Sequence, residues 1–123
     1  MLEVIPMSLL MIVIDYMYLS YISCYFKKQI KHVQGTDMKL DLLAAIICYF
    51  FLCLGLYYFV VSQKKSVFDA FLLGLVIYCV YETTNKAIIT NWKWKTVLID
   101  GVWGGILFAI VTFLTYKVMG HLK

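Results

Sequence analysis

The stretch LDLLAAIICYFFLCLGLYYFVV, residues 40–61, decides the fold class. Asp41 is its only charged residue, and the remainder is almost continuously apolar. A helix needs about 20 mostly apolar residues to cross the hydrocarbon core of a bilayer. We therefore interpret this stretch as a transmembrane helix whose aromatic end, Tyr57 to Phe59, lies at a membrane interface.

Three further apolar runs of similar length flank this stretch. The expected spans are residues 4–26, 40–61, 67–89 and 96–119. With 63% hydrophobic and only 15% charged residues, a chain of 123 residues could not bury so much apolar surface as a soluble domain. The sequence therefore predicts an all-α fold, an integral membrane four-helix transmembrane bundle that forms a single transmembrane domain over residues 1–123.

The net charge of +4 comes from lysines that lie mostly between or beside the apolar runs. In such positions cations anchor helices and meet lipid headgroups. Lysines in the first and third connections slightly outnumber those in the second connection and near the C-terminus: Lys27, Lys28, Lys31, Lys39, Lys93 and Lys95 against Lys64, Lys65, Lys117 and Lys123. This bias places the first and third connections in the cytoplasm. Because the charges are scattered, nucleic acid is not an expected partner.

The cysteines give no sign of a metal site. Cys24, Cys48, Cys53 and Cys79 all fall within apolar runs, with no Cys-x-x-Cys pair and no histidine at metal-ligand spacing. We interpret them as small buried thiols and expect no metal and no cofactor.

Besides Asp41 and Asp69 at the starts of their spans, three carboxyl groups lie within the expected spans. Asp15 is near the middle of the first span, Glu82 lies beyond the middle of the third, and Asp100 enters the fourth from the same side as Glu82. An ionisable group within a membrane helix is costly, so it should face the bundle interior or water. We expect the three groups to converge in one half of the bundle.

Polar and aromatic residues accompany these carboxyl groups. Tyr81, Glu82 and Asn85 share a helix face, and Lys86 follows Glu82 by four residues, the favourable order for an intrahelical ion pair. The sequence thus predicts a ligand-binding site and no catalytic residues. The candidate ligand-binding residues are Asp15, Tyr18, Tyr81, Glu82, Asn85, Lys86, Asp100 and Trp103.

Most of these features also have a simpler explanation. A carboxyl group in the first turn of a helix is favoured by the helix dipole, which would account for Asp100, Asp41 and Asp69. Glu82 and Lys86 could form a neutral structural pair near the interface. Asp15 lies too deep for either explanation, which makes it the strongest functional candidate. A hydrogen bond between helices would also account for it.

Small residues in the fourth span predict a packing surface. Gly101, Gly105 and Ala109 form a stripe at helical spacing, and Gly104 lies along its border. Such stripes allow the backbones of neighbouring helices to approach closely. We expect Gly101, Gly104 and Gly105 to contact another helix.

Three segments together resemble a family of small predicted membrane proteins catalogued as domain of unknown function 2177. They are DYMYLS (residues 15–20), YETTNKAIITNW (81–92) and LIDGVWG (98–104). The residues that match the family pattern are Asp15, Tyr81, Thr84, Asn85, Trp92, Asp100, Trp103 and Gly104. The chain has Tyr18 where the family usually has Trp, Glu82 where it has Asp, and Lys86 where it has an apolar residue. The resemblance implies a fold and a polar cluster, and no reaction.

Two functions of different kinds agree with these features. In the first, the carboxylate-lined site inside the bundle binds or moves a cation, a proton or a lipid headgroup. In the second, the chain is a structural component of a virion or a larger membrane assembly and has no ligand. A membrane enzyme is least favoured, because the sequence has no nucleophile and base pair, no cluster of metal-binding histidines and no phosphate loop.

The expected location and partners follow from these hypotheses. The chain should be a multi-pass integral protein of the plasma membrane or of a viral internal membrane. Its expected partners are the lipid bilayer, a small cation or lipid headgroup, and either further copies of this chain or a larger membrane or virion assembly.

Overall fold

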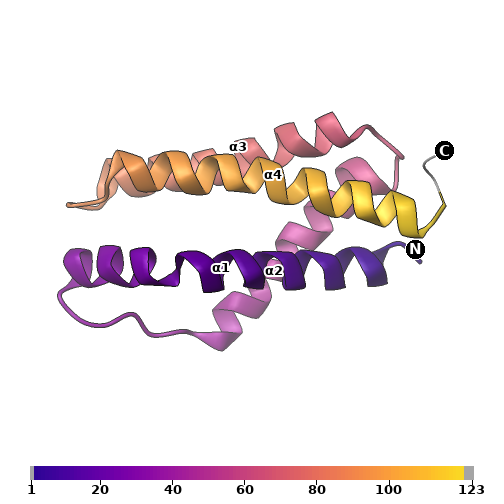
Figure 1. The fold of residues 1–123 in the computed structure, drawn as a ribbon. Coiled ribbons are helices and arrows are strands. Elements are labelled where there is room, and N and C mark those ends of the chain that lie inside the picture. Colours follow the sequence, from indigo (N-terminus) through magenta and orange to yellow (C-terminus); the bar gives the residue numbers. More distant parts are fainter. Residues whose placement is uncertain (1, 121–123) are drawn as a thin grey trace.

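The computed structural model describes residues 2–120 and consists of long helices (Figure 1). They are α1 (Val4–Gln34), α2 (Leu42–Leu56), which continues into the π-helical turn η1 (Tyr57–Val61), α3 (Val67–Ile88) and α4 (Trp94–Val118). Counting α2 and η1 together, these four helices are long and apolar enough to cross a membrane. The predicted all-α, four-helix membrane fold is confirmed. Lys123, which entered the charge comparison, lies outside the described residues.

Helix α1 is longer than the span expected for it. It runs to Gln34 instead of residue 26, and its 31 residues correspond to about 46 Å, whereas the hydrocarbon core is about 30 Å thick. Its last turns, with Lys27, Lys28 and Lys31, therefore extend beyond the apolar layer. Gly35 ends the helix in a left-handed conformation (φ 78°), and its N–H donates to the Lys31 carbonyl oxygen at 2.8 Å.

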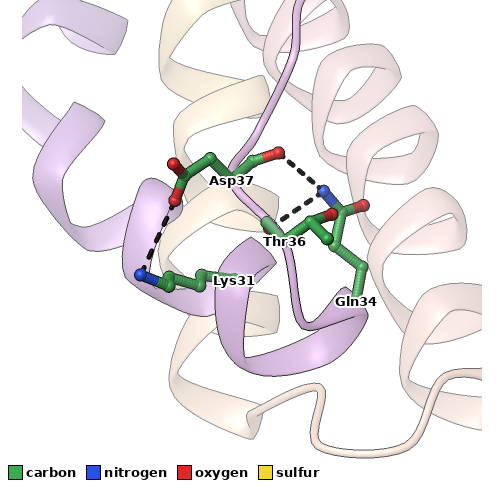
Figure 2. Close-up of polar contacts among 4 residues, drawn as sticks. All are labelled: Lys31, Gln34, Thr36 and Asp37. Atoms are coloured by element: carbon green, nitrogen blue, oxygen red, sulfur yellow. Dashed lines mark hydrogen bonds and ion pairs between the residues drawn. The ribbon is translucent and has the colours of Figure 1, made fainter.

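The connection after α1 is organised by contacts between neighbouring residues (Figure 2). Gln34 Nε2 donates to the carbonyl oxygens of Thr36 and Asp37, at 3.1 and 3.0 Å. Lys31 Nζ lies 3.7 Å from Asp37 Oδ1. These contacts are exposed and add little stability, but they turn the chain back along the bundle toward α2.

Two aspartates at helix starts have local roles. Asp41 caps α2 by accepting a hydrogen bond from the Ala44 N–H at 3.1 Å, and Asp69 lies in the first turn of α3. Asp100 is different, because α4 begins at Trp94 and Asp100 lies beyond its first turn. The helix dipole therefore does not account for Asp100, contrary to the simpler explanation.

Helices α3 and α4 form a tight antiparallel hairpin, α1 packs along α4, and α2 crosses behind α1 at a steep angle (Figure 1). The N-terminus and the end of α4 lie at the end of the bundle where η1 turns into α3, and the other two connections lie toward the opposite end. The buried core consists of Met7, Met11, Leu56, Val60, Val61, Ala70, Leu107, Phe108, Val111 and Tyr116.

Glycines allow the close contact between α3 and α4. A Cβ atom at Gly74 would overlap the backbone carbonyl group of Gly104. A Cβ at Gly101 would lie 2.8 Å from Cys79 Sγ, and one at Gly105 would lie 3.1 Å from a backbone oxygen of α3. The glycines of the fourth span thus face α3, and Gly74 completes the contact from the other helix.

Candidate functional site

Asp15 joins three helices. Its side chain is 7% exposed, Trp103 Nε1 of α4 donates to Oδ1 at 2.9 Å, and the Tyr49 hydroxyl of α2 donates to Oδ2. Within the described residues no lysine forms an ion pair with Asp15. The carboxyl group therefore has two neutral donors and no balancing cation among the residues of the structure.

Glu82 and Asp100 form a second carboxyl cluster, between α3 and α4. Glu82 is 1% exposed and accepts a hydrogen bond of 2.8 Å from Trp92 Nε1. The Asp100 carboxyl group lies near that of Glu82. Two buried carboxyl groups that lie close together repel each other when both are ionised. We therefore expect this pair to share a proton.

Tyr18 and Asn85 contribute buried polar atoms that have no partner. The Tyr18 ring stacks on Trp103, with centroids 4.2 Å apart and planes inclined by 5°. Within the part of the chain that the structure describes, Tyr18 Oη and Asn85 Nδ2 have no hydrogen-bond partner. An unsatisfied buried polar atom costs about 1–3 kcal/mol, so these atoms favour a polar ligand or water beside them.

Lys86 turns away from the carboxyl groups, whereas Tyr81 lines the same groove as Asp15. Lys86 Nζ is 5.6 Å from the centroid of the Trp94 ring, and no ion pair joins it to Glu82 within residues 2–120. The expected Glu82–Lys86 ion pair is therefore wrong, since Glu82 accepts a hydrogen bond from Trp92 while Lys86 lies over the Trp94 ring. Tyr81 is 58% exposed and faces the groove described next.

A groove with a volume of about 1010 Å³ separates α1 from α2 and reaches Tyr78 and Tyr81 of α3. Its walls are mostly apolar, and among residues 2–120 Asp15 is the only Asp or Glu that lines it. No lysine in that range lines it either. Asp15 is thus the one acidic group that residues 2–120 place on the walls of a mostly apolar groove. The apolar wall residues include Ile12, Leu19, Ile46, Phe50, Leu52 and Leu54.

Metal binding receives no support from the geometry of residues 2–120. No group of three or more His, Cys, Asp or Glu side chains in that range is placed to hold a metal ion. The three carboxyl groups lie in one part of the bundle along α4: Trp103 contacts Asp15, and Asp100 lies near Glu82.

Sequence reasoning misses two donors of this site. Tyr49 lies within an apolar run, although a phenol in the middle of such a run is a sign of a buried hydrogen bond. Trp92 has the position of an interfacial aromatic, yet it is 5% exposed and bonds to Glu82. The pairing of Tyr49 with Asp15 could not be read from spacing, because the two residues lie on different helices.

A separate polar network, also missed, ties α1 to the connection before α4. Gln29 is 4% exposed, and its Nε2 donates to the Asn91 carbonyl oxygen at 2.8 Å. Thr96 Oγ1 donates to Gln29 Oε1 at 2.8 Å and lies 2.7 Å from the Tyr25 hydroxyl. This network holds α1 against the connection before α4, at the end of the bundle where α1 ends and α4 begins.

Comparison with known proteins gives one match. A protein-family model, described as predicted membrane protein (DUF2177), matches residues 1–117. No curated protein and no solved structure matches the chain.

Proposed function

The chain belongs to the DUF2177 family of predicted membrane proteins, and from this premise we propose that its groove binds an amphipathic amine from the bilayer. The apolar part of the ligand lies between α1 and α2, and its protonated amine contacts Asp15. The observation that carries the proposal is that, in the described part of the chain, Asp15 is the only acidic residue on the walls of a large apolar groove.

The size and walls of the groove suit a hydrocarbon chain. Its volume of about 1010 Å³ is at the upper end of the range of about 300–1,000 Å³ for small-molecule sites. Because the groove lies on membrane-spanning helices, a ligand can enter it directly from the lipid. Apolar walls alone would not distinguish such a ligand from ordinary lipid tails, so specificity must come from the polar group.

Asp15 can receive an amine without releasing its present partners. Each carboxylate oxygen has two lone pairs, so the bonds from Tyr49 and Trp103 leave room for a further donor. A buried carboxylate is costly unless it is paired, and an amine supplies the missing positive charge. Tyr49 and Trp103 then act by holding the carboxyl group in position.

Photo-crosslinking in lipid nanodiscs tests this function. A diazirine derivative of dodecylamine should label groove residues such as Leu19 and Ile46, and excess dodecylamine should compete while dodecanol should not. Asp15→Asn should reduce the labelling at least about tenfold, because it removes the charge and keeps the shape. Asp69→Asn, at an exposed position, is the matched control. Equal labelling of the groove in wild type and Asp15→Asn contradicts the proposal.

A structural role is the second candidate, and the direct hydrogen bonds from Asp15 to α2 and α4 favour it. In that case Asp15 only fixes the positions of the helices, and the groove holds lipid tails without selection. Dodecylamine and dodecanol would then compete equally well for the label. This role requires no charge, because the amide introduced by Asp15→Asn could keep both contacts if Tyr49 reversed the direction of its hydrogen bond.

A further inference from the structure

A second hollow lies at the opposite end of α1 from the N-terminus, away from the groove. It has a volume of about 290 Å³ and is lined by Tyr25, Lys28, Gln29, His32 and Lys93. The four residues from α1 recur at intervals of three and four, so they share one face of the helix. Lys93 comes from the connection between α3 and α4, immediately before α4.

The position of this hollow is at the membrane surface. Helix α1 is about 15 Å longer than the hydrocarbon core requires, and its last turns carry Lys28 and His32. Lysine side chains at this depth lie among lipid headgroups. The hollow is therefore accessible both to headgroups and to ions in the adjoining water.

The wall of the hollow is built by buried hydrogen bonds. Gln29 is buried, and it holds the Asn91 carbonyl group and the Thr96 hydroxyl group. Asn91 adopts a left-handed backbone conformation (φ 72°), which shapes the connection that leads to Lys93. These contacts fix the Lys93 backbone against α1, so that Lys28 and Lys93 line the same space from two different elements.

The charge in and around the hollow is positive. No Asp or Glu of the residues that the structure describes lines it. Asp37, the carboxylate that follows α1, is paired with Lys31 at 3.7 Å. Lys95 adds a further cation nearby, because its Nζ lies 5.5 Å from the centroid of the Tyr25 ring, and Tyr25 lines the hollow.

We propose that this hollow binds a phosphate monoester at the membrane surface, through Lys28 and Lys93 on opposite walls and His32 beside them. A phosphate monoester carries a charge of about −1.5 to −2 at pH 7, which matches two lysines better than a singly charged carboxylate does. Basic pockets between membrane helices are suited to such headgroups. The source can be the headgroup of phosphatidic acid or free phosphate. The site is independent of the groove and of its amine.

Calorimetric titration of the full chain in a non-ionic detergent tests the site. The probes are dioctanoyl phosphatidic acid, inorganic phosphate and dioctanoyl phosphatidylcholine. We expect saturable binding of phosphatidic acid and none of phosphatidylcholine, whose phosphate is a diester covered by choline. Inorganic phosphate that competes as well as phosphatidic acid identifies free phosphate as the source. Competition only at a concentration at least about 100-fold higher identifies the lipid headgroup.

Matched charge variants complete the test. Lys28→Gln with Lys93→Gln should weaken binding of phosphatidic acid roughly 30-fold, because both lysines contribute attraction near the surface. Lys65→Gln with Lys117→Gln removes the same charge from the other end of the bundle and should leave the affinity unchanged. All four side chains are exposed, so neither variant should unfold. Equal loss in both variants, unchanged affinity in the first, or equal binding of phosphatidylcholine overturns the proposal.

Discussion

Trp103 donates a hydrogen bond of 2.9 Å to Asp15 across 88 positions of sequence, while its ring is stacked on Tyr18, one turn after Asp15 on α1. The indole therefore contacts α1 at two successive turns, through its N–H and through its face. This double contact fixes α4 against α1 and holds the Asp15 carboxyl group at the wall of the groove. Loss of the indole N–H would leave the Tyr49 hydroxyl as the donor that still holds the carboxyl group.

Tyr49→Phe should loosen α2, because it removes a hydrogen bond that joins α2 to Asp15 of α1. Hydrogen bonds between membrane helices contribute about 1 kcal/mol, and we expect a loss of that size in thermal unfolding. Pairs of spin labels on Tyr21 and Ile47, both exposed, should give a broader distance distribution. Tyr58→Phe is the control, since its ring is exposed. Identical distributions in both variants would show that Asp15 does not hold α2.

Trp92→Phe should destabilise the bundle by about 1–3 kcal/mol, because Glu82 loses a donor while it stays buried. Trp94→Phe makes the same chemical change at a largely exposed ring and should have little effect. Circular dichroism of both variants during heating in detergent measures the difference. Equal melting temperatures would mean that the Trp92–Glu82 bond contributes no net stability.

Glu82→Gln should keep the bundle stable, because the amide oxygen still accepts from Trp92 and the amide nitrogen offers a donor to the nearby Asp100. Infrared spectroscopy should detect the carbonyl band of a protonated carboxyl group in the wild type. We expect this band to disappear in the double variant Glu82→Gln with Asp100→Asn, and to persist in Asp41→Asn, an exposed cap. Persistence of the band in the double variant would place the proton elsewhere.

Gly74→Ala should destabilise the hairpin of α3 and α4, because the added methyl group meets the backbone of Gly104, which has no side chain that could move. Gly55→Ala is the matched control: it is also a helical glycine, and a Cβ there meets nothing within 4 Å. Alanine is favoured over glycine within helices by about 1 kcal/mol, so the control should gain stability. A gain in both variants would contradict the close contact between the helices.

Cysteine labelling tests the predicted membrane topology. In a chain whose native cysteines are replaced by alanine, Lys39→Cys and Lys65→Cys should be labelled by an impermeant reagent from opposite sides of the membrane. Lys65 is preferred to Lys64, which has a left-handed backbone conformation (φ 53°). Labelling of both positions from the same side would exclude the alternating topology.

The amino-acid sequence alone predicts that the chain consists of membrane-spanning helices and roughly where each one lies. In hydrocarbon every backbone polar group must be bonded within the protein, so an apolar run of sufficient length such as residues 40–61 has few alternatives to a helix. The depth of Asp15 and the clustering of glycines in the fourth span could also be predicted from the sequence, since both depend only on position along a helix. The end of α1 could not be predicted accurately, because a helix can continue into polar sequence beyond the lipid.

Which side chains meet depends on how the helices pack. Glu82 bonds to Trp92 instead of Lys86, Asp15 bonds to Tyr49 and Trp103, and the steep crossing of α2 leaves the groove beside α1. These pairings depend on how each helix is rotated and tilted. A helix that is apolar on every side, as α2 is, carries no pattern that sets its rotation, because lipid tails solvate its faces about as well as another helix does.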